Sequence, residues 1–131
     1  MKYLVTGAAG FIGYHVCLSL LKSNKIVYGL DDINNYYDIK LKKERLKNLQ
    51  YFKKFKFKKL DISDYNHLKK TFKLFKPSVI IHLAAQAGVR YSIKNPHAYT
   101  KSNLVGFANI LECSRTSKIK HLIFASSSSV Y

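Results

Sequence analysis

Residues 3–13 read YLVTGAAGFIG, an apolar run that leads into a GxxGxxG string formed by Gly7, Gly10 and Gly13. At a turn from strand to helix, the first glycine permits a tight bend, the second lets a pyrophosphate approach the backbone, and the third lets the helix pack near the sheet. The start of such a helix also offers free N–H groups and the positive end of its dipole. We therefore predict a phosphate-binding turn here. Close helix packing, which also favours small residues, is the alternative explanation.

The remainder of the chain continues this alternation of strand and helix patterns. Short apolar, β-branched runs predict strands over Tyr3–Thr6, Ile26–Leu30, Phe55–Leu60, Val79–Leu83 and His121–Ala125. Longer helical patterns cover Phe11–Ser23, about Asp38–Leu49, the residues after Ser63 to about Phe75, and about Ala98–Arg115. The strand runs are apolar throughout, which is typical of a parallel sheet with helices on both faces. Strict alternation of strand and helix predicts a doubly wound α/β fold.

Two of the predicted helices carry more specific signals. The helix that starts near Asp38 has a thin apolar stripe, formed by Leu41, Leu46 and Leu49, and we expect it to lie on the surface. For the next helix we predict Ser63 as the N-cap, because a serine hydroxyl accepts from free N–H groups at a helix start. Pro77 should end that helix, since proline cannot continue it.

A carboxylate closes the second predicted strand. Asp31 follows the run Val27–Leu30, where an acid can accept hydrogen bonds from the hydroxyls of an adenosine ribose and repel a 2′-phosphate. This position favours NAD over NADP as a ligand. An ordinary turn-forming aspartate is the alternative, and the preceding glycine turn favours ribose recognition. Asp61 and Ile62 follow the third strand in the same way and are candidates to contact the adenine.

Composition limits the class of protein. The chain has 131 residues, 47% of them apolar, which suits one domain with a real core and excludes a disordered tail. No apolar stretch approaches the roughly 20 residues of a membrane span, and the N-terminus does not resemble a secretory signal. Two cysteines, Cys17 and Cys113, do not form a disulfide framework, so we expect a cytoplasmic protein without a membrane partner.

The formal net charge of +16 raises the prior for anionic partners. Its main source is the segment from Lys40 to Lys59, where Glu44 is the only acid among ten basic residues and aromatic residues are interleaved. Such a segment is compatible with a nucleic-acid surface. Because nearly all of these cations are lysines, which recognise phosphate with less geometric specificity than arginine, we favour a solvated face and expect no nucleic-acid partner.

Three further strings, together with the glycine turn, identify a family resemblance. They are GLDDINNYYD at 29–38, HLAAQAGVRYS at 82–92 and SSSSVY at 126–131. With TGAAGFIG they make the whole chain similar to the extended short-chain dehydrogenase/reductases, the NAD-dependent epimerases and dehydratases. Within that superfamily the chain most resembles the UDP-glucuronate 4-epimerases. The resemblance implies a Rossmann-type sheet with strand order 3-2-1-4-5, cut after strand five, and NAD as the cofactor.

The resemblance also implies roles for individual residues. Those that bind the cofactor are Gly7, Gly10, Phe11 and Ile12 at the pyrophosphate, Gly13 in the same turn, Asp31 at the ribose, Asp61 and Ile62 at the adenine, and Leu83, Ala84, Ala85 and Gln86 near the nicotinamide. Asn103 matches an asparagine that steadies the cofactor and neighbouring loops. Ser127 matches the catalytic hydroxyl, while Ser128, Ser129 and Arg90 would face the sugar. Four serines after a strand are also compatible with a polar turn that caps backbone groups.

The family chemistry further needs a tyrosine and a lysine, in a YxxxK string on the helix after strand five, and the sequence stops at Tyr131 before such a helix. Two YxxxK strings occur earlier, at Tyr36 and Tyr65, and we assign neither a role because both should lie far from the nicotinamide. We therefore expect residues 1–131 to be an incomplete NAD-binding domain, without later strands or a substrate domain, and inactive alone.

The complete enzyme implied by the resemblance is an epimerase that acts on a UDP-sugar, expected as a homodimer. A nucleotide-sugar 4,6-dehydratase is the first alternative, although Ser128 and Ser129 stand where dehydratases usually place Asp-Glu. The second alternative is a non-catalytic NAD-binding module or a basic nucleic-acid-binding module. No cluster of Cys and His has the spacing of a metal site, so we predict none.

Overall fold

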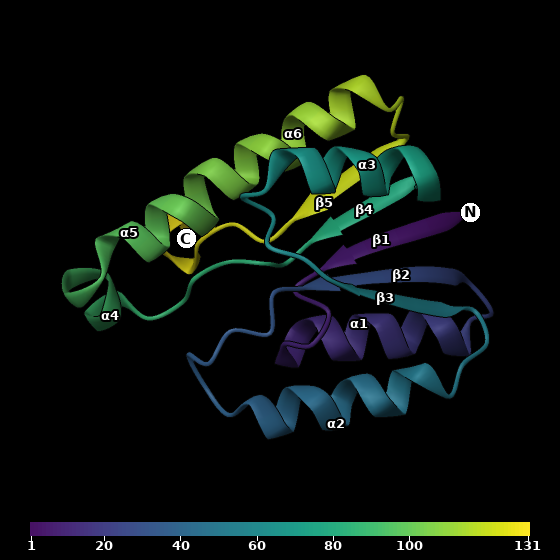
Figure 1. Ribbon diagram of the computed structural model, residues 1–131, viewed down its shortest axis with the longest axis horizontal. Helices are drawn as coiled ribbons and strands as arrows, with labels where there is room; N and C mark the ends of the chain where they lie inside the picture. The colour runs from purple at the N-terminus through teal and green to yellow at the C-terminus, as the bar shows by residue number, and fades with distance from the viewer.

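The computed structural model describes residues 1–131 and contains a five-stranded parallel sheet (Figure 1). Its strands are β1 (Lys2–Thr6), β2 (Ile26–Asp31), β3 (Phe55–Lys59), β4 (Val79–His82) and β5 (His121–Phe124). They lie in the order β3-β2-β1-β4-β5, and every neighbouring pair is parallel. The predicted doubly wound α/β fold and its strand order are confirmed. The order reverses between β1 and β4, the point at which ligands bind in such sheets.

Four long helices cover the two faces of the sheet (Figure 1). They are α1 (Phe11–Lys22) and α2 (Ile39–Gln50) on one face, with α3 (Tyr65–Phe75) and α6 (Phe107–Thr116) on the other. Each face has its own buried cluster. One contains Val5 and Phe55 of the sheet with Cys17 of α1, and the other contains Leu4 of the sheet with Phe72 of α3. No helix combines the length and apolar character that crossing a membrane requires.

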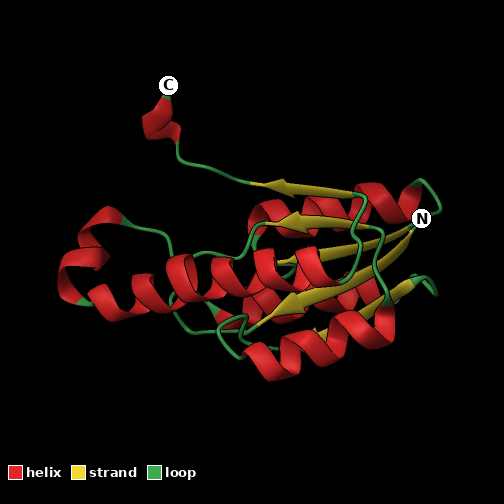
Figure 2. Cartoon of the chain, turned by 90° about the horizontal axis from the view of Figure 1, so that it is seen from above, coloured by secondary structure: helices red, strands yellow, loops and turns green.

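The segment between β4 and β5 is more complex than the single helix predicted for Ala98–Arg115. It contains α4 (Val89–Lys94), α5 (Pro96–Tyr99), a π-helical segment, η1 (Thr100–Gly106), and then α6. A new helix starts at Pro96 because proline suits the first helical turn and Asn95 caps it, accepting from the Ala98 N–H at 3.3 Å. α4 and α5 extend beyond the carboxyl ends of the strands (Figure 2).

Two predicted details of the helices were wrong. Asp64, not Ser63, is the N-cap of α3, because its carboxylate accepts from the His67 N–H at 3.2 Å. In α2 the buried stripe is formed by Lys42, Leu46 and Leu49, which follow one another at helical spacing of four and three residues. Leu41, expected in that stripe, is turned away from the core and 42% exposed.

Strand β5 forms one edge of the sheet and is the least covered strand. Ile123 and Phe124 remain 45% and 49% exposed. After β5 the chain leaves the sheet and forms a short 3₁₀ turn, η2 (Ser128–Val130), which lies apart from the body of the molecule (Figure 2). The C-terminal serines are therefore carried by an exposed segment.

Candidate functional site

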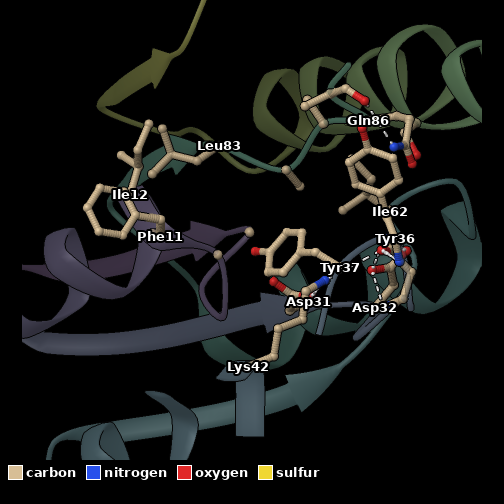
Figure 3. A pocket seen from close by; sticks show the side chains of 18 of the residues that line it. Phe11, Ile12, Asp31, Asp32, Tyr36, Tyr37, Lys42, Ile62, Leu83 and Gln86 are labelled. Carbon is tan, nitrogen blue, oxygen red and sulfur yellow. Dashed lines mark hydrogen bonds and ion pairs between the residues drawn. The ribbon is translucent and has the colours of Figure 1, made fainter. Parts of the chain in front are cut away.

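A cavity of about 520 Å³ opens at the carboxyl ends of the strands (Figure 3). Its walls come from the segments that follow each of the five strands and therefore reach the same edge of the sheet. Most of the residues predicted to bind the cofactor line it, namely Gly7, Gly10, Phe11, Ile12, Gly13, Asp31, Asp61, Ile62, Leu83, Ala84, Ala85 and Gln86. The fold thus brings together twelve positions that the sequence places between residues 7 and 86.

The glycine turn forms one end of this cavity. Gly7 adopts a positive φ of 70°, and its carbonyl accepts from the Gly10 N–H at 3.0 Å. A Cβ on Gly13 would lie only 2.0 Å from the Gly7 oxygen, so the helix can approach this closely only with glycine there. Because Phe11 and Ile12 occupy the first turn of α1, their N–H groups have no partner inside the helix and are free to bind an anion.

Asp31 ties this turn to the end of β2. Its carboxylate accepts from the Ala9 N–H at 3.0 Å and from the Ile33 N–H at 2.8 Å, one on each oxygen. Only 7% of the residue is exposed. A carboxylate oxygen has two acceptor positions, so each oxygen keeps one for a further donor. Asp31 therefore holds the turn, as the turn-forming alternative predicted, while it retains acceptor capacity at the cavity wall.

Lys42 is the site residue that the sequence patterns least suggested. It is 4% exposed, and its ammonium lies 3.7 Å from Asp31 Oδ1 and 4.7 Å from the centre of the Tyr37 ring. Asn34 Oδ1 also accepts from it at 3.5 Å. Figure 3 shows Asp31, Lys42 and Tyr37 grouped at one side of the cavity. We expected the side chains of the basic segment to be solvated, and for Lys42 this is wrong. Its ammonium can be buried because the Asp31 carboxylate and the Tyr37 ring replace the contacts that it would make with water.

Arg45 is a second cation that the patterns missed. Its guanidinium donates to the Ala9 carbonyl at 3.1 Å and lies 5.8 Å from the Phe11 ring centre. Their spacing in the sequence could have predicted that the two cations lie together, since positions 42 and 45 are three apart and share one face of α2. This face meets the glycine turn, so two cations border the place where we predict phosphate.

Thr6 and His82 connect β1 to β4 under the opposite side of the cavity. The Thr6 hydroxyl accepts from the N–H groups of Leu83 and Ala84, at 3.1 and 3.0 Å. It also lies 2.7 Å from His82 Nδ1. Burial lowers the pKa of His82 to about 4, so the ring is neutral at pH 7. These contacts fix the backbone of Leu83 and Ala84 against the cavity.

Asp61 and Ile62 line the cavity beyond β3. Asp61 forms an ion pair with Lys101 of η1 at 2.8 Å and accepts from the Ser63 N–H and hydroxyl. Partial burial raises the pKa of Asp61, but hydrogen bonds from Lys101 and Ser63 outweigh it and the net pKa is lowered. Asp61 therefore stays ionised at pH 7 and links the end of β3 to the segment before α6.

Asn103 lies behind the cavity wall and makes two hydrogen bonds with one residue. Its side-chain oxygen accepts from the Gln86 N–H at 2.8 Å, and its amide nitrogen donates to the Gln86 carbonyl at 3.1 Å. This pairing holds the loop after β4 in the way expected for a loop-steadying asparagine. A direct role of Asn103 at a cofactor stays a prediction.

The remaining predicted residues are not brought to this cavity. Arg90 lies on the exposed helix α4, and Ser127, Ser128 and Ser129 lie on the exposed C-terminal segment. The Ser127 hydroxyl accepts from the Ser129 N–H at 3.1 Å, so it caps a local turn. Tyr36, which we assigned no role, lines the cavity, and its ring is tilted by 46° against the Tyr91 ring with 4.9 Å between the ring centres. The catalytic and substrate roles of Ser127–Ser129 and Arg90 stay predictions.

The fold and the glycine turn at its switch point define a Rossmann-type domain of the doubly wound class. A family model described as GDP-mannose 4,6 dehydratase matches residues 4–131, and the chain belongs to this family.

Curated relatives and solved structures are similar over essentially the whole chain. Protein CapI of Staphylococcus aureus is 53% identical over 131 residues, covering 100% of this chain and 39% of the relative. The UDP-glucuronate 4-epimerase of Thermodesulfobacterium geofontis is 47% identical over 129 residues, covering 98% of this chain and 40% of the relative. A crystal structure of the Bacillus cereus UDP-glucuronic acid 4-epimerase with UDP-glucuronic acid and NAD superposes with a TM-score of 0.91, at 38% identity, covering 100% and 41%. The chain thus spans about 40% of the length of these relatives.

Proposed function

We propose that residues 1–131 form the cofactor-binding part of an NAD-dependent nucleotide-sugar epimerase that acts on UDP-glucuronate. The observation that carries this proposal is the glycine turn with free N–H groups at Phe11 and Ile12, tied to Asp31 at one edge of the same cavity. Similarity to a UDP-glucuronic acid 4-epimerase solved with NAD supports the choice of cofactor and sugar.

The residues present fit NAD in charge and shape. The N–H groups of Phe11 and Ile12 would receive the diphosphate, with Arg45 and Lys42 nearby, and the free acceptor positions of Asp31 would receive ribose hydroxyls. Asp61 and Ile62 would border the adenine, and the loop Leu83–Gln86, held by Thr6 and Asn103, would border the nicotinamide. Bound NAD supplies a hydride acceptor for C4 of the sugar, which allows return of the hydride to the opposite face.

Proton transfer from the sugar hydroxyl needs a base near the nicotinamide. Ser127 is the hydroxyl that we propose for the sugar side, with Ser128 and Ser129 near its carboxylate and Arg90 as a further cation. Neither Tyr36 with Lys40 nor Tyr65 with Lys69 follows the serine segment along the chain. We therefore propose that epimerisation requires residues other than these 131. The 131 residues themselves bind NAD but do not turn over the sugar.

The test is calorimetric titration of the 131-residue protein with NAD, compared with Asp31→Arg. We expect one site, and we expect the variant to bind at least tenfold more weakly because its side chain displaces a carboxylate acceptor. Unchanged NAD affinity in Asp31→Arg would contradict the cofactor site. Incubation with NAD and UDP-glucuronate, followed by separation of the sugars, should show no UDP-galacturonate. Formation of that product would contradict the proposed need for further residues.

A 4,6-dehydratase is the second candidate, because the matching family model carries that name. Its chemistry removes water across C5 and C6 and therefore needs a hydroxyl at C6, which a uronate lacks. In the longer protein that contains these residues, turnover of UDP-glucuronate without mass change supports epimerisation. Loss of one water from GDP-mannose or UDP-glucose would favour the dehydratase.

We also propose a cytoplasmic homodimer with no membrane or nucleic-acid partner. Both cysteines are free and buried, and burial raises the pKa of Cys17 to about 12 and of Cys113 to about 11. Buried thiols of this kind need no oxidising compartment. Sedimentation of the longer protein with NAD tests the dimer, and a monomer at micromolar concentration would exclude it.

A further inference from the structure

A second hollow, of about 440 Å³, lies on the face of the sheet that α3 covers, beside the C-terminal half of that helix. None of its residues lines the cavity described above. Its ten lining residues are Lys2, Ile26, Tyr28, Lys53, Lys54, Lys56, Lys58, Thr71, Leu74 and Phe75. We call this hollow the lysine groove. Its volume falls within the range of small-molecule sites.

Strand alternation places two of these lysines in the groove. Phe55 packs into the cluster under α1 and α2, and Phe57 packs against it. Successive side chains of a strand point to opposite faces, so Lys56 and Lys58 point to the face that carries α3. Lys56 is paired in register with Tyr28 of β2, whose ring lies 4.8 Å from that of Phe75.

The charge of the groove is uncompensated. Five lysines from two chain segments, β1 and residues 53–58, line it, and no carboxylate does. Lys2, Lys54 and Lys58 donate only to neutral oxygens, those of Phe75, Asn24 and Thr71. An ammonium has three donors, so each of them keeps donors for a ligand. Lys53 and Lys56 form neither a hydrogen bond nor an ion pair with the protein.

Charged residues on an edge strand also discourage aggregation, which is an alternative reason for lysines on β3. That role requires cations only along the exposed edge. Lys2 comes instead from β1, in the middle of the sheet, and is held beside the Phe75 ring at 5.5 Å. Lysines of β1 and of β3 with its preceding turn thus converge on the aromatic rings of Tyr28 and Phe75, as an anionic ligand requires.

We propose that the lysine groove binds a small polyphosphate anion, either a free oligophosphate or the phosphate chain of a nucleotide. The ammoniums neutralise successive phosphates as point charges. Tyr28 and Phe75 provide apolar surface on which a base can pack. This site is independent of the proposed NAD site, because the two share no residue.

The experiment is calorimetric titration of the protein with tripolyphosphate, ATP and inorganic phosphate at about 150 mM salt, where surface charges are well screened. Lys53→Gln/Lys56→Gln removes the two unpaired ammoniums. Lys47→Gln/Lys120→Gln removes the same charge from exposed positions outside the groove. Thermal unfolding of each variant without ligand checks folding, and titrations are repeated with saturating NAD.

We expect one binding site for tripolyphosphate. Its dissociation constant should rise about tenfold or more in Lys53→Gln/Lys56→Gln and stay unchanged in Lys47→Gln/Lys120→Gln. Saturating NAD should not compete with tripolyphosphate. Tighter binding of ATP than of tripolyphosphate identifies a nucleotide as the source, and the reverse identifies a free oligophosphate. Equal weakening in both variants, competition by NAD, or no binding overturns the proposal. Preference for a single-stranded oligonucleotide over both small ligands also overturns it, in favour of a nucleic-acid surface.

Discussion

The hydroxyl of Thr6 and the ring of His82 form a hydrogen bond in which only the hydroxyl can donate the proton. The distance between Thr6 Oγ1 and His82 Nδ1 is 2.7 Å. The hydroxyl already accepts from two N–H groups, of Leu83 and Ala84, and both of its acceptor positions are therefore filled. Its proton must point to His82, so Nδ1 accepts and carries no proton. This arrangement requires a neutral His82 and fixes the loop after β4.

The first prediction concerns acid stability. In the unfolded chain a histidine titrates near 6.5, whereas burial lowers the pKa of His82 to about 4. Between these values the unfolded chain binds more protons, so the free energy of unfolding falls as pH decreases from 6.5 to 4, by about 3 kcal/mol in total. Above pH 6.5 this residue contributes no pH dependence. Urea unfolding measured across pH 4–7 tests the prediction.

The matched variants for this experiment are His82→Gln and His121→Gln, at a buried and an exposed histidine. His82→Gln should flatten the stability profile over this range, while His121→Gln should leave it as in the natural sequence. A flat profile in the natural sequence, or an equal effect of the two variants, would show that His82 does not control acid stability.

The second prediction concerns the glycine turn. Gly13→Ala places a methyl group where the Gly7 oxygen is 2.0 Å away, and backbone must move to relieve the overlap. We expect a loss of about 3 kcal/mol in the free energy of unfolding, together with weaker NAD binding. Chemical denaturation measures the first effect. Ser19→Ala, at an exposed position of the same helix, should be neutral or slightly stabilising, and an equally mild Gly13→Ala would argue against the tight turn.

The third prediction separates the two roles of Asp31. Asp31→Asn keeps the shape but can accept on only one side-chain atom, so one of the N–H groups of Ala9 and Ile33 loses its partner. We expect a loss of about 1–3 kcal/mol in stability and a weaker affinity for NAD. Glu44→Gln, which neutralises an exposed acid in α2, should change neither. If stability falls while NAD affinity is unchanged, Asp31 serves only as a turn former.

The fourth prediction concerns the buried lysine. Lys42→Met retains the aliphatic length but removes the ammonium that faces Asp31 and Tyr37. Removing one member of a buried charge pair is destabilising, and we expect a loss of about 2 kcal/mol because the Asp31 carboxylate keeps its two N–H donors. Lys43→Met, at the neighbouring exposed position, serves as the comparison in urea unfolding. Equal stability of the two variants would refute a structural role for Lys42.

Spacing along the chain was a reliable guide where a local rule decides the structure. The glycine turn and Asp31 at the end of β2 followed from such rules, whereas the order of the strands followed from the family resemblance. Helix caps were less predictable, because Ser63 and Asp64 are both good caps and their neighbours decide between them. The break before α5 depended on Asn95 and Pro96, which the helical periodicity from Ala98 onward did not reveal.

By itself the sequence determined the class of fold and the position of the glycine turn, because apolar periodicity and glycine spacing act over a few residues. Only the tertiary structure decided which side chains complete the site. The Thr6 hydroxyl meets Ala84 across 78 positions of the chain, and the Asp31 carboxylate meets Ala9 across 22. Lys42 is buried only because packing brings Asp31 and Tyr37 against it. Such contacts depend on how distant segments pack, which no local pattern encodes.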